Sequence, residues 1–205
     1  LGDKDNFWPA EAKEKGPNGP CGPCSEIFFD YGINPECKNK HCDPSCDCGR
    51  FSEIWNLVFT QFNRKDGGVL EPLPGKNIDT GMGLERTLVV LNGYADVFQI
   101  DTLWPVILKI ESISGREYIE SKEVTRSMRI IADHLRTATM ITGEDKGVAP
   151  SNVDQGYIVR RLIRRAVRHG RLLGMHENFC DQIAQEVIKI FNHSLYPSPT
   201  RGGAG

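Results

Sequence analysis

The first half of the chain alternates short apolar runs with stretches rich in glycine and proline, which is typical of strands joined by turns. Residues 25–31 and 51–63 are rich in aromatic and β-branched side chains, and we predict a strand in each. A shorter edge segment is predicted at 70–74. The stretch 1–24 ends in a run dense in glycine and proline, and we predict a loop there.

A further strand is predicted to begin at Ile78 and to continue through a glycine-containing bend into a helix. Gly81 and Gly83 allow the backbone to turn tightly between the strand and the helix. Gly93 follows the last apolar residues of this helix, at a position where helices commonly end.

In the second half the apolar positions recur every three or four residues, which indicates amphipathic helices. We predict helices over 101–113, 121–142, 156–173 and 179–191. A frayed end is expected at 197–205. Because the pattern changes around 94–100, we divide the chain into residues 1–97 and 98–205. The predicted fold class is α+β: an antiparallel sheet followed by an all-helical domain.

Composition sets few limits on function. The chain has 205 residues, 39% of them hydrophobic, which is enough for a core in one large domain or two small ones. The net charge of −2 gives no indication of a nucleic-acid partner, so the distribution of charge matters more than its total. No apolar run reaches the length of about 18 residues that a membrane-spanning helix needs, so no membrane segment is expected.

Cysteine usage indicates the compartment. Six of the seven cysteines lie before residue 49. A secreted disulfide scaffold would be shorter and would spread its cysteines along the chain, so a reduced intracellular protein with a local metal site fits better. We therefore expect a cytoplasmic protein.

The loop 32–50 contains a cluster of four cysteines: Cys37, Cys42, Cys46 and Cys48. Four thiolates can hold a tetrahedral zinc ion when a short loop is free to fold around it. The spacing is not that of a common zinc finger, and Cys21 and Cys24 could compete as ligands. A disordered loop and oxidised thiols are the alternatives. A bound zinc ion would stabilise the insertion and take no part in the chemistry.

The predicted helix 156–173 concentrates positive charge. Six arginines and no acid lie between residues 157 and 174, on the face opposite the apolar positions. Arginines spaced about one turn (~5.4 Å) apart suit a phosphate backbone. A solvated face paired with acids elsewhere is the alternative, but the absence of acids in this stretch favours RNA. The candidate RNA contacts are Arg160, Arg161, Arg164, Arg165 and Arg168.

The stretch from Asp79 to Arg86 is the most informative in the chain. It places an acid at the end of a strand and an arginine in the first turns of the following helix. A ligand with an ammonium group and either a phosphate or an aromatic ring could use both charges. On its spacing alone, an ordinary strand-to-helix turn with a surface Glu/Arg pair is the favoured explanation, because two glycines separated by one residue are common.

This stretch closely resembles the third signature motif of class II aminoacyl-tRNA synthetases, in the form found in alanyl-tRNA synthetases. Further segments resemble the same family and follow in the right order: 6–8, 19–27, 53–64, and 131–136 with its continuation at 150–152 and 156–161. The resemblance implies that residues 1–97 are the C-terminal half of the catalytic domain, with a Cys-rich insertion at 32–50. Residues 98–205 would be an incomplete helical domain that binds the tRNA acceptor stem.

The resemblance also implies an alanine pocket. Asp79 would bind the ammonium group of alanine through a charge-assisted hydrogen bond. Asn56 would supply polar contacts, and Val58 would form a wall sized for a methyl group. Trp8 would close another side, and Gly81 would leave room for the substrate. Without the resemblance, Trp8 is an ordinary rim aromatic and Val58 a core residue.

Two further roles follow from the resemblance. Arg86 matches the arginine that stacks on the adenine of ATP and faces its γ-phosphate, a task that suits a planar guanidinium. Asn152 matches a position that contacts the wobble pair of the acceptor stem in the minor groove, the readable groove of A-form RNA. Asp133, His134 and Arg136 also match a family segment, but a structural ion-pair cluster explains them equally well.

The implied reaction is activation of alanine by ATP and Mg²⁺ to alanyl-adenylate, followed by transfer to the 3′ end of tRNA(Ala). The two earlier signature motifs of class II synthetases have no counterpart in this chain, so we expect the chain alone to be inactive. A non-catalytic RNA-binding paralogue and a zinc-stabilised RNA-binding module are the alternatives. The joint presence of Asp79, Asn56 and Arg86 argues against both. The sequence does not indicate an oligomeric state.

Overall fold

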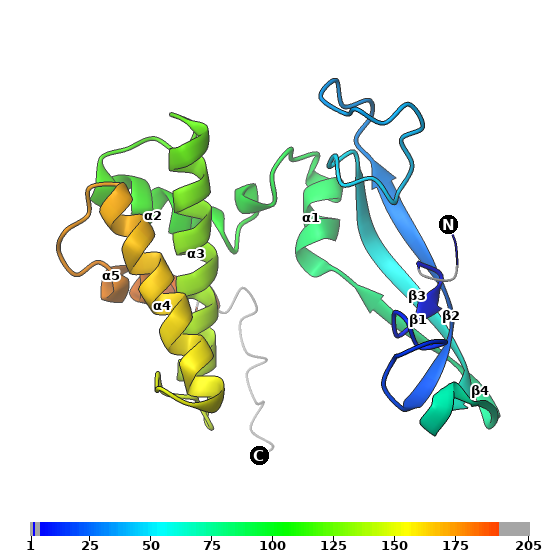
Figure 1. Ribbon diagram of the computed structural model, residues 1–205. Helices are drawn as coiled ribbons and strands as arrows, with labels where there is room; N and C mark the ends of the chain where they lie inside the picture. Colours follow the sequence, from blue (N-terminus) through cyan, green and yellow to red (C-terminus); the bar gives the residue numbers. More distant parts are fainter. Residues whose placement is uncertain (1, 3–4, 193–205) are drawn as a thin grey trace, which may run out of the picture. The chain divides into compact units, whose positions relative to one another are not determined.

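The computed structural model describes residue 2 and residues 5–192 (Figure 1). The expected frayed end at 197–205 lies outside these residues. The chain divides into two compact units, Leu1–Ala95 and Asp96–Gly205. In the described residues, the first unit is an antiparallel sheet with one α-helix and the second is all-helical. The predicted α+β class is therefore confirmed.

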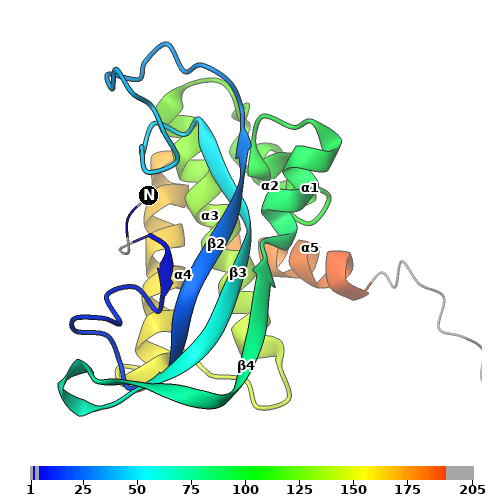
Figure 2. The same ribbon diagram turned by 90° about the vertical axis from the view of Figure 1, so that its right-hand side faces the viewer.

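The sheet is a meander in which each strand pairs with the next one in the chain (Figure 2). Its strands are β1 (Phe7–Trp8), β2 (Gly19–Asp30), β3 (Phe51–Arg64) and β4 (Leu70–Met82). The three long strands are antiparallel, with β3 between β2 and β4. The expected edge segment at 70–74 and the strand expected from Ile78 are one continuous strand. The turn before it contains a short 3-10 helix, η1 (Asp66–Gly68).

The expectation of a loop over residues 1–24 is wrong in its last part, because β2 already begins at Gly19. Proline disfavours helical conformations in the residue before it, so a Gly/Pro run also suits an extended strand. The pairing of β2 with β3 is irregular between Cys21 and Cys24, around Pro23, which has no N–H to donate. Gly22 is required by a close approach, since a Cβ there would lie 1.9 Å from the carbonyl oxygen of Phe59.

The helix α1 (Leu84–Asn92) follows β4 and contacts β3. It ends at Gly93, whose φ of 66° lies in the left-handed region, as the sequence predicted. A small core of this unit contains the buried residues Phe7, Ala12 and Cys21.

The second unit begins with the short 3-10 helix η2 (Val97–Gln99). Its α-helices are α2 (Trp104–Ser114), α3 (Lys122–Gly143), α4 (Asp154–Leu172) and α5 (Cys180–Asn192). The four helices predicted for this region are confirmed, with ends shifted by a few residues. α3 and α4 pack side by side and antiparallel (Figure 1). The core of the unit includes Ile107, Met128, Ile131 and Ile183, which are fully buried.

A polar cluster joins the start of this unit to α3. Arg129 donates from Nε to the hydroxyl of Tyr118 at 2.6 Å and from Nη2 to Oδ2 of Asp96 at 2.7 Å. The tyrosine hydroxyl in turn donates to Asp96. Burial raises the pKa of Tyr118 to about 12, so this donor keeps its proton at neutral pH. The charge of Arg129 is therefore neutralised within the fold.

A helix that crosses a lipid bilayer must be both long and apolar. In the part of the chain that the structure describes, no helix meets both requirements for crossing a membrane.

We predict that Gly170→Ala destabilises the helical unit by roughly 1–3 kcal/mol, because overpacking strains a closely packed core. A Cβ at Gly170 in α4 would lie 2.3 Å from the ring of Phe179, which is itself buried. Urea unfolding followed by circular dichroism measures the change. Gly143→Ala in α3 is the matched control, because no described atom lies within 4 Å of its Cβ position. We expect the control to match or slightly exceed the wild-type stability, and equal stability of the two variants would contradict the prediction.

Candidate functional site

The register of the sheet brings Glu26, Asn56 and Gly81 opposite one another on β2, β3 and β4. Asn56 donates from Nδ2 to Oε1 of Glu26 at 2.9 Å, which orients its amide. The other amide atom, Oδ1 of Asn56, is buried and has no hydrogen-bond partner in the described structure. A buried acceptor without a donor costs roughly 1–3 kcal/mol. This oxygen is therefore suited to accept a hydrogen bond from a ligand.

A second row lies two residues further along each strand. Cys24, Val58 and Asp79 are opposite one another on β2, β3 and β4. Because side chains two residues apart in a strand share a face, this row and the Asn56 row lie on the same face of the sheet. Val58 is buried and Asp79 is exposed. The structure thus brings together four of the five residues expected to bind alanine: Asn56, Val58, Asp79 and Gly81.

Negative charge gathers around this face. Burial raises the pKa of Glu26, and the carboxylates of Glu53 and Asp5 raise it further. Asp79 accepts a hydrogen bond from the backbone N–H of Thr80 through Oδ1 at 2.9 Å. Its other oxygen has no partner in the described residues. The face therefore favours a cationic group, such as an ammonium.

Gly81 is not explained by the fold itself. No described atom lies within 4 Å of the position that a Cβ would take, and the φ of Gly81 is outside the left-handed region. Neither packing nor backbone conformation therefore demands glycine at this position. The open space above it is available to a ligand.

Trp8 is the one expected alanine-site residue that the two rows do not include. It lies on β1 opposite Gly22, and its side chain is 47% exposed. No cross-strand pair connects it to Asn56 or Val58. The structure leaves it as an exposed aromatic beside β2.

Arg86 lies in the first turn of α1 and reaches back to β3. Its Nη1 donates to the carbonyl oxygen of Glu53 at 2.9 Å and lies 3.9 Å from Oε2 of the same residue. The side chain is 57% exposed, so the guanidinium is oriented by β3 while much of its surface faces solvent. Such an arrangement can stack on a planar ring or bind a phosphate.

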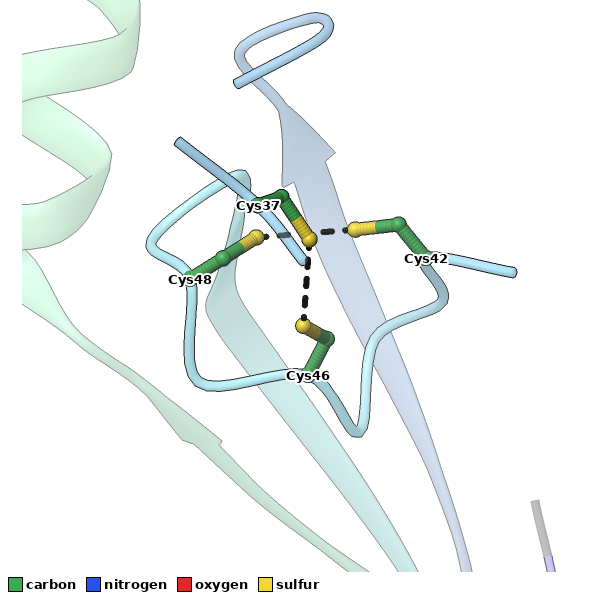
Figure 3. Close-up of side chains that lie close together, drawn as sticks. All are labelled: Cys37, Cys42, Cys46 and Cys48. Carbon is green, nitrogen blue, oxygen red and sulfur yellow. Dashed lines mark hydrogen bonds between the residues drawn. The ribbon is translucent and has the colours of Figure 1, made fainter. Parts of the chain in front are cut away.

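The four cysteines of the insertion converge, although no regular secondary structure holds them (Figure 3). Their sulfur atoms all lie within 4.8 Å of one another. Sγ of Cys37 is 3.7 Å from Sγ of Cys46, and Sγ of Cys42 is 3.5 Å from Sγ of Cys48. Tetrahedral zinc with Zn–S bonds of ~2.3 Å separates its sulfur ligands by ~3.8 Å. The arrangement fits a zinc ion.

Cys21 and Cys24 do not belong to this group, so the expectation that they could compete as ligands is wrong. Both lie on β2 and are buried. Cys21 belongs to the small core with Phe7. Cys24 donates from Sγ to the carbonyl oxygen of Asp5 at 3.5 Å. Strand pairing therefore places both thiols away from the insertion.

One thiol of the cluster, that of Cys46, has a lowered pKa. The backbone N–H of Cys48 and the side-chain amide of Asn39 lower the pKa of Cys46 to about 7. Desolvation raises the pKa of Cys42 to about 12. Since the thiolate is the form that binds zinc, Cys46 offers a metal ligand at neutral pH, and a bound cation would favour ionisation of the others.

The arginines of α4 form one band, of which five are exposed and Arg160 is half-buried; we call it the arginine face: Arg160, Arg161, Arg164, Arg165, Arg168 and Arg171. At 3.6 residues per turn they span roughly 140° of the helix surface. The opposite side buries Val159 and Ala166. None of the six forms an ion pair with an acid in the described structure. The alternative, in which the arginines of α4 pair with acids elsewhere in the fold, is therefore not supported by the described structure.

Asn152 is exposed in the loop that precedes α4. The N–H of Ser151 donates to the carbonyl oxygen of Gly156 at 3.0 Å, which folds the loop against the first turn of the helix. A Cβ at Gly156 would lie 2.3 Å from Oγ of Ser151, so only glycine permits this approach. Asn152 is thus held at one end of the arginine face.

Some residues of these sites could not be identified from the sequence. Glu26 is a single acid in a strand, and its importance appears only from the register that places it against Asn56. On α3, Asp133 and His134 contact each other at 2.9 Å between Oδ2 and Nδ1, as a local ion-pair explanation expects. The cations Lys122 and Arg126 on the same helix gave no motif that could have identified them.

Comparisons with known proteins give a consistent result. A family model described as "tRNA synthetases class II (A)" matches residues 1–199. The chain is 48% identical over 197 residues to an "Alanine--tRNA ligase" of Clostridioides difficile, covering 96% of this chain and 21% of the relative. The chain is also 47% identical over 204 residues to the protein of the same name from Thermotoga maritima. This alignment covers 98% of the chain and 23% of the relative.

The chain thus spans about a fifth of the length of these relatives. The family model matches nearly all residues of this chain. This match agrees with the order of β4, the glycine bend and α1, which carry Asp79 and Arg86. The chain belongs to the class II (A) tRNA synthetase family.

Proposed function

We propose that the chain is a segment of an alanine–tRNA ligase. The whole ligase activates alanine with ATP to alanyl-adenylate and transfers the alanyl group to the 3′ end of tRNA(Ala). The first unit contributes to the alanine and ATP site, and the second contacts the tRNA acceptor stem. The observation that carries this proposal is the sheet face on which Asn56, Val58, Asp79 and Gly81 lie together. The names and identities of the relatives support the same substrate.

In this proposal the sheet face holds alanine by its ammonium group. Asp79 supplies a negative charge, and the unpaired Oδ1 of Asn56 supplies a second acceptor. Val58 provides apolar surface for the methyl group, and the open space at Gly81 admits the substrate. Trp8, which pairs with Gly22 and with none of these residues, would close another side when alanine is bound. A charge-assisted hydrogen bond is strong where the bound substrate excludes water from it.

Arg86 is the proposed ATP contact, with its guanidinium held by Glu53 and otherwise exposed. ATP brings Mg²⁺, which proteins usually bind through one or two carboxylates together with the phosphates. Glu26 and Glu53 carry carboxylate oxygens that could serve as ligands of this Mg²⁺ ion. Adenylate formation requires the alanine carboxylate to attack the α-phosphate, so positioning of the two substrates and neutralisation of charge account for most of the catalysis.

The cysteine cluster is a proposed structural zinc site formed by Cys37, Cys42, Cys46 and Cys48. The sulfur separations and the low pKa of Cys46 support it. Zinc would tie the long insertion into one conformation and supply no chemistry to the reaction. A reducing cytoplasm, where we propose that the protein acts, keeps these thiols available.

The arginine face and Asn152 are the proposed contacts to the acceptor stem of tRNA(Ala). The arginines, among them Arg160, Arg161, Arg164, Arg165 and Arg168, would bind phosphates. Asn152 would reach a base edge in the minor groove. Phosphate contacts supply affinity and base contacts supply specificity, so the two sets of residues have separable effects.

We predict that Asp79→Asn in the full-length ligase raises the KM for alanine and lowers kcat/KM about 10- to 100-fold, because a hydrogen bond to a charged group is lost. Alanine-dependent pyrophosphate exchange measures both parameters. Glu71→Gln on the same strand is the matched control, and its kinetics should equal those of the wild type. Asp79→Asn kinetics equal to the control would show that Asp79 does not bind the ammonium group.

We predict about one zinc ion per chain in reduced protein purified without chelator, as expected for four thiolate ligands. Elemental analysis measures the content, and Cys42→Ser should reduce it strongly. Cys180→Ser is the control, since Cys180 lies in α5 and outside the cluster. Absence of zinc from the wild-type chain, with freely titrating thiols, would contradict the proposal.

We predict that Arg161→Gln with Arg168→Gln weakens binding of the 205-residue chain to an acceptor-stem RNA hairpin. Each lost phosphate contact lowers the slope of log K against log salt by roughly 0.7–0.9, so the pair should lower it by about 1.4–1.8. Asn152→Ala should keep the slope and lose the preference for the cognate wobble pair. Binding isotherms at several salt concentrations test both, and an unchanged slope in the double variant would remove the arginine face as the RNA site.

A further inference from the structure

A second basic surface lies beside the arginine face. A depression of about 780 Å³ opens between α3, the turn before it, and α4. We call it the α3/α4 pocket. Its lining residues are Ile119, Ser121, Lys122, Thr125, Arg126, Arg129, Ile130 and Arg165. Half of them are cationic and none is acidic, so the pocket has a positive potential.

Most of this positive charge is not compensated by the fold. Arg129 is paired with Asp96, as described above. Lys122, Arg126 and Arg165 are exposed, and none of the three has an acidic partner within the described part of the chain. Elsewhere in the same unit, an exposed arginine such as Arg116 pairs with a nearby acid, Glu120. The three free cations are therefore available to an external anion.

A half-buried histidine on α4 is affected by this excess of charge. His169 of α4 contacts Oγ of Ser127 on α3 at 3.1 Å through Nδ1. Burial lowers the pKa of His169, and Arg165, Arg168, Arg126 and His134 lower it further. These charged groups come from both helices that pack around the imidazole. An anion in the pocket would offset their repulsion.

We propose that the α3/α4 pocket binds a ribose-phosphate of the RNA backbone, with Lys122, Arg126 and Arg165 on the phosphate. This inference rests on the proposed binding of the acceptor stem and extends it from α4 to α3. Arg165 belongs both to the pocket and to the arginine face, so the two surfaces are continuous. An RNA strand bound along the arginine face of α4 therefore reaches the α3/α4 pocket over continuous basic surface.

The apolar part of the lining favours a nucleotide unit over a bare inorganic anion. Ile119 is 83% exposed at the rim, and Ile130 contributes to the wall. A ribose presents carbon atoms that can cover such surface, whereas free phosphate cannot. Arg126 can bind two phosphate oxygens through its planar guanidinium, and Lys122 acts as a mobile point charge. Arg129, fixed by Tyr118 and Asp96, shapes the wall.

The test compares two double variants of the 205-residue chain that remove the same charge. Lys122→Gln with Arg126→Gln empties the pocket of two cations. Lys109→Gln with Lys189→Gln removes two from α2 and α5, outside the pocket. Binding of the acceptor-stem RNA hairpin is measured against salt for both variants, and circular dichroism checks the fold. We expect the pocket variant to bind about tenfold more weakly, with a slope lower by about one unit, and the control to bind like the wild type.

The outcomes separate this inference from the proposed function. If the pocket variant binds like the control while Arg161→Gln with Arg168→Gln weakens binding, the pocket is not occupied and the arginine face is the whole site. If neither pair of substitutions weakens binding, RNA recognition by the helical unit fails, and the pocket proposal fails with it. Equal weakening by pocket and control variants would indicate only the loss of general charge, which also overturns the pocket.

A second readout distinguishes RNA backbone from free phosphate. The pKa of His169 is followed by NMR in the free chain, with the RNA hairpin, and with inorganic phosphate at equal ionic strength. We expect the hairpin to raise this pKa, because its negative charge offsets the surrounding cations, and to raise it less in the pocket variant. A rise with inorganic phosphate and none with the hairpin would reassign the pocket to small anions and overturn the proposal.

Discussion

The hydrogen-bonded register of β3 with both of its neighbours is the constraint on which the proposed substrate site depends. A slip of one residue would turn every side chain of the strand to the other face of the sheet. The observed register places Asn56 between Glu26 and Gly81, and Val58 between Cys24 and Asp79. Acceptors for an ammonium, apolar surface and free space therefore meet on one face. The bend at Gly83 then starts α1 close enough to β3 for Arg86 to contact Glu53.

The helical unit shows how a nearly neutral chain can carry a strongly basic surface. The arginines of α4 repel one another, but five of the six are exposed, where water and salt screen the repulsion. The helix is stabilised by its opposite side, where Val159 and Ala166 are buried. Unpaired cations of α3 extend the same surface. The fold thus tolerates the charge because burial of one side outweighs repulsion on the other, which leaves the cations free for a phosphate backbone.

The cysteine insertion depends on neither of these packing arrangements. It holds no strand or helix, and its thiols converge through turns around residues such as Asn39 and Asp43. Four sulfurs at van der Waals separation gain little from one another, so the arrangement makes physical sense when a cation is shared between them. Cys21 and Cys24, by contrast, are fixed by the sheet and behave as buried apolar groups.

The sequence by itself determined the helices, because their apolar period and terminal glycines are local signals, as at Gly93 and in α4. It also determined the family through ordered motifs, and the cysteine group through spacing within one loop. It failed at β2, where a Gly/Pro run was assigned to a loop although pairing with β3 makes it a strand. Only the tertiary structure decided which residues come together across strands and helices: Glu26 pairs with Asn56, and Lys122, Arg126 and Arg165 line one pocket. Both arrangements bring together positions 30 or more residues apart, and no local pattern specifies them, because they depend on strand register and helix packing.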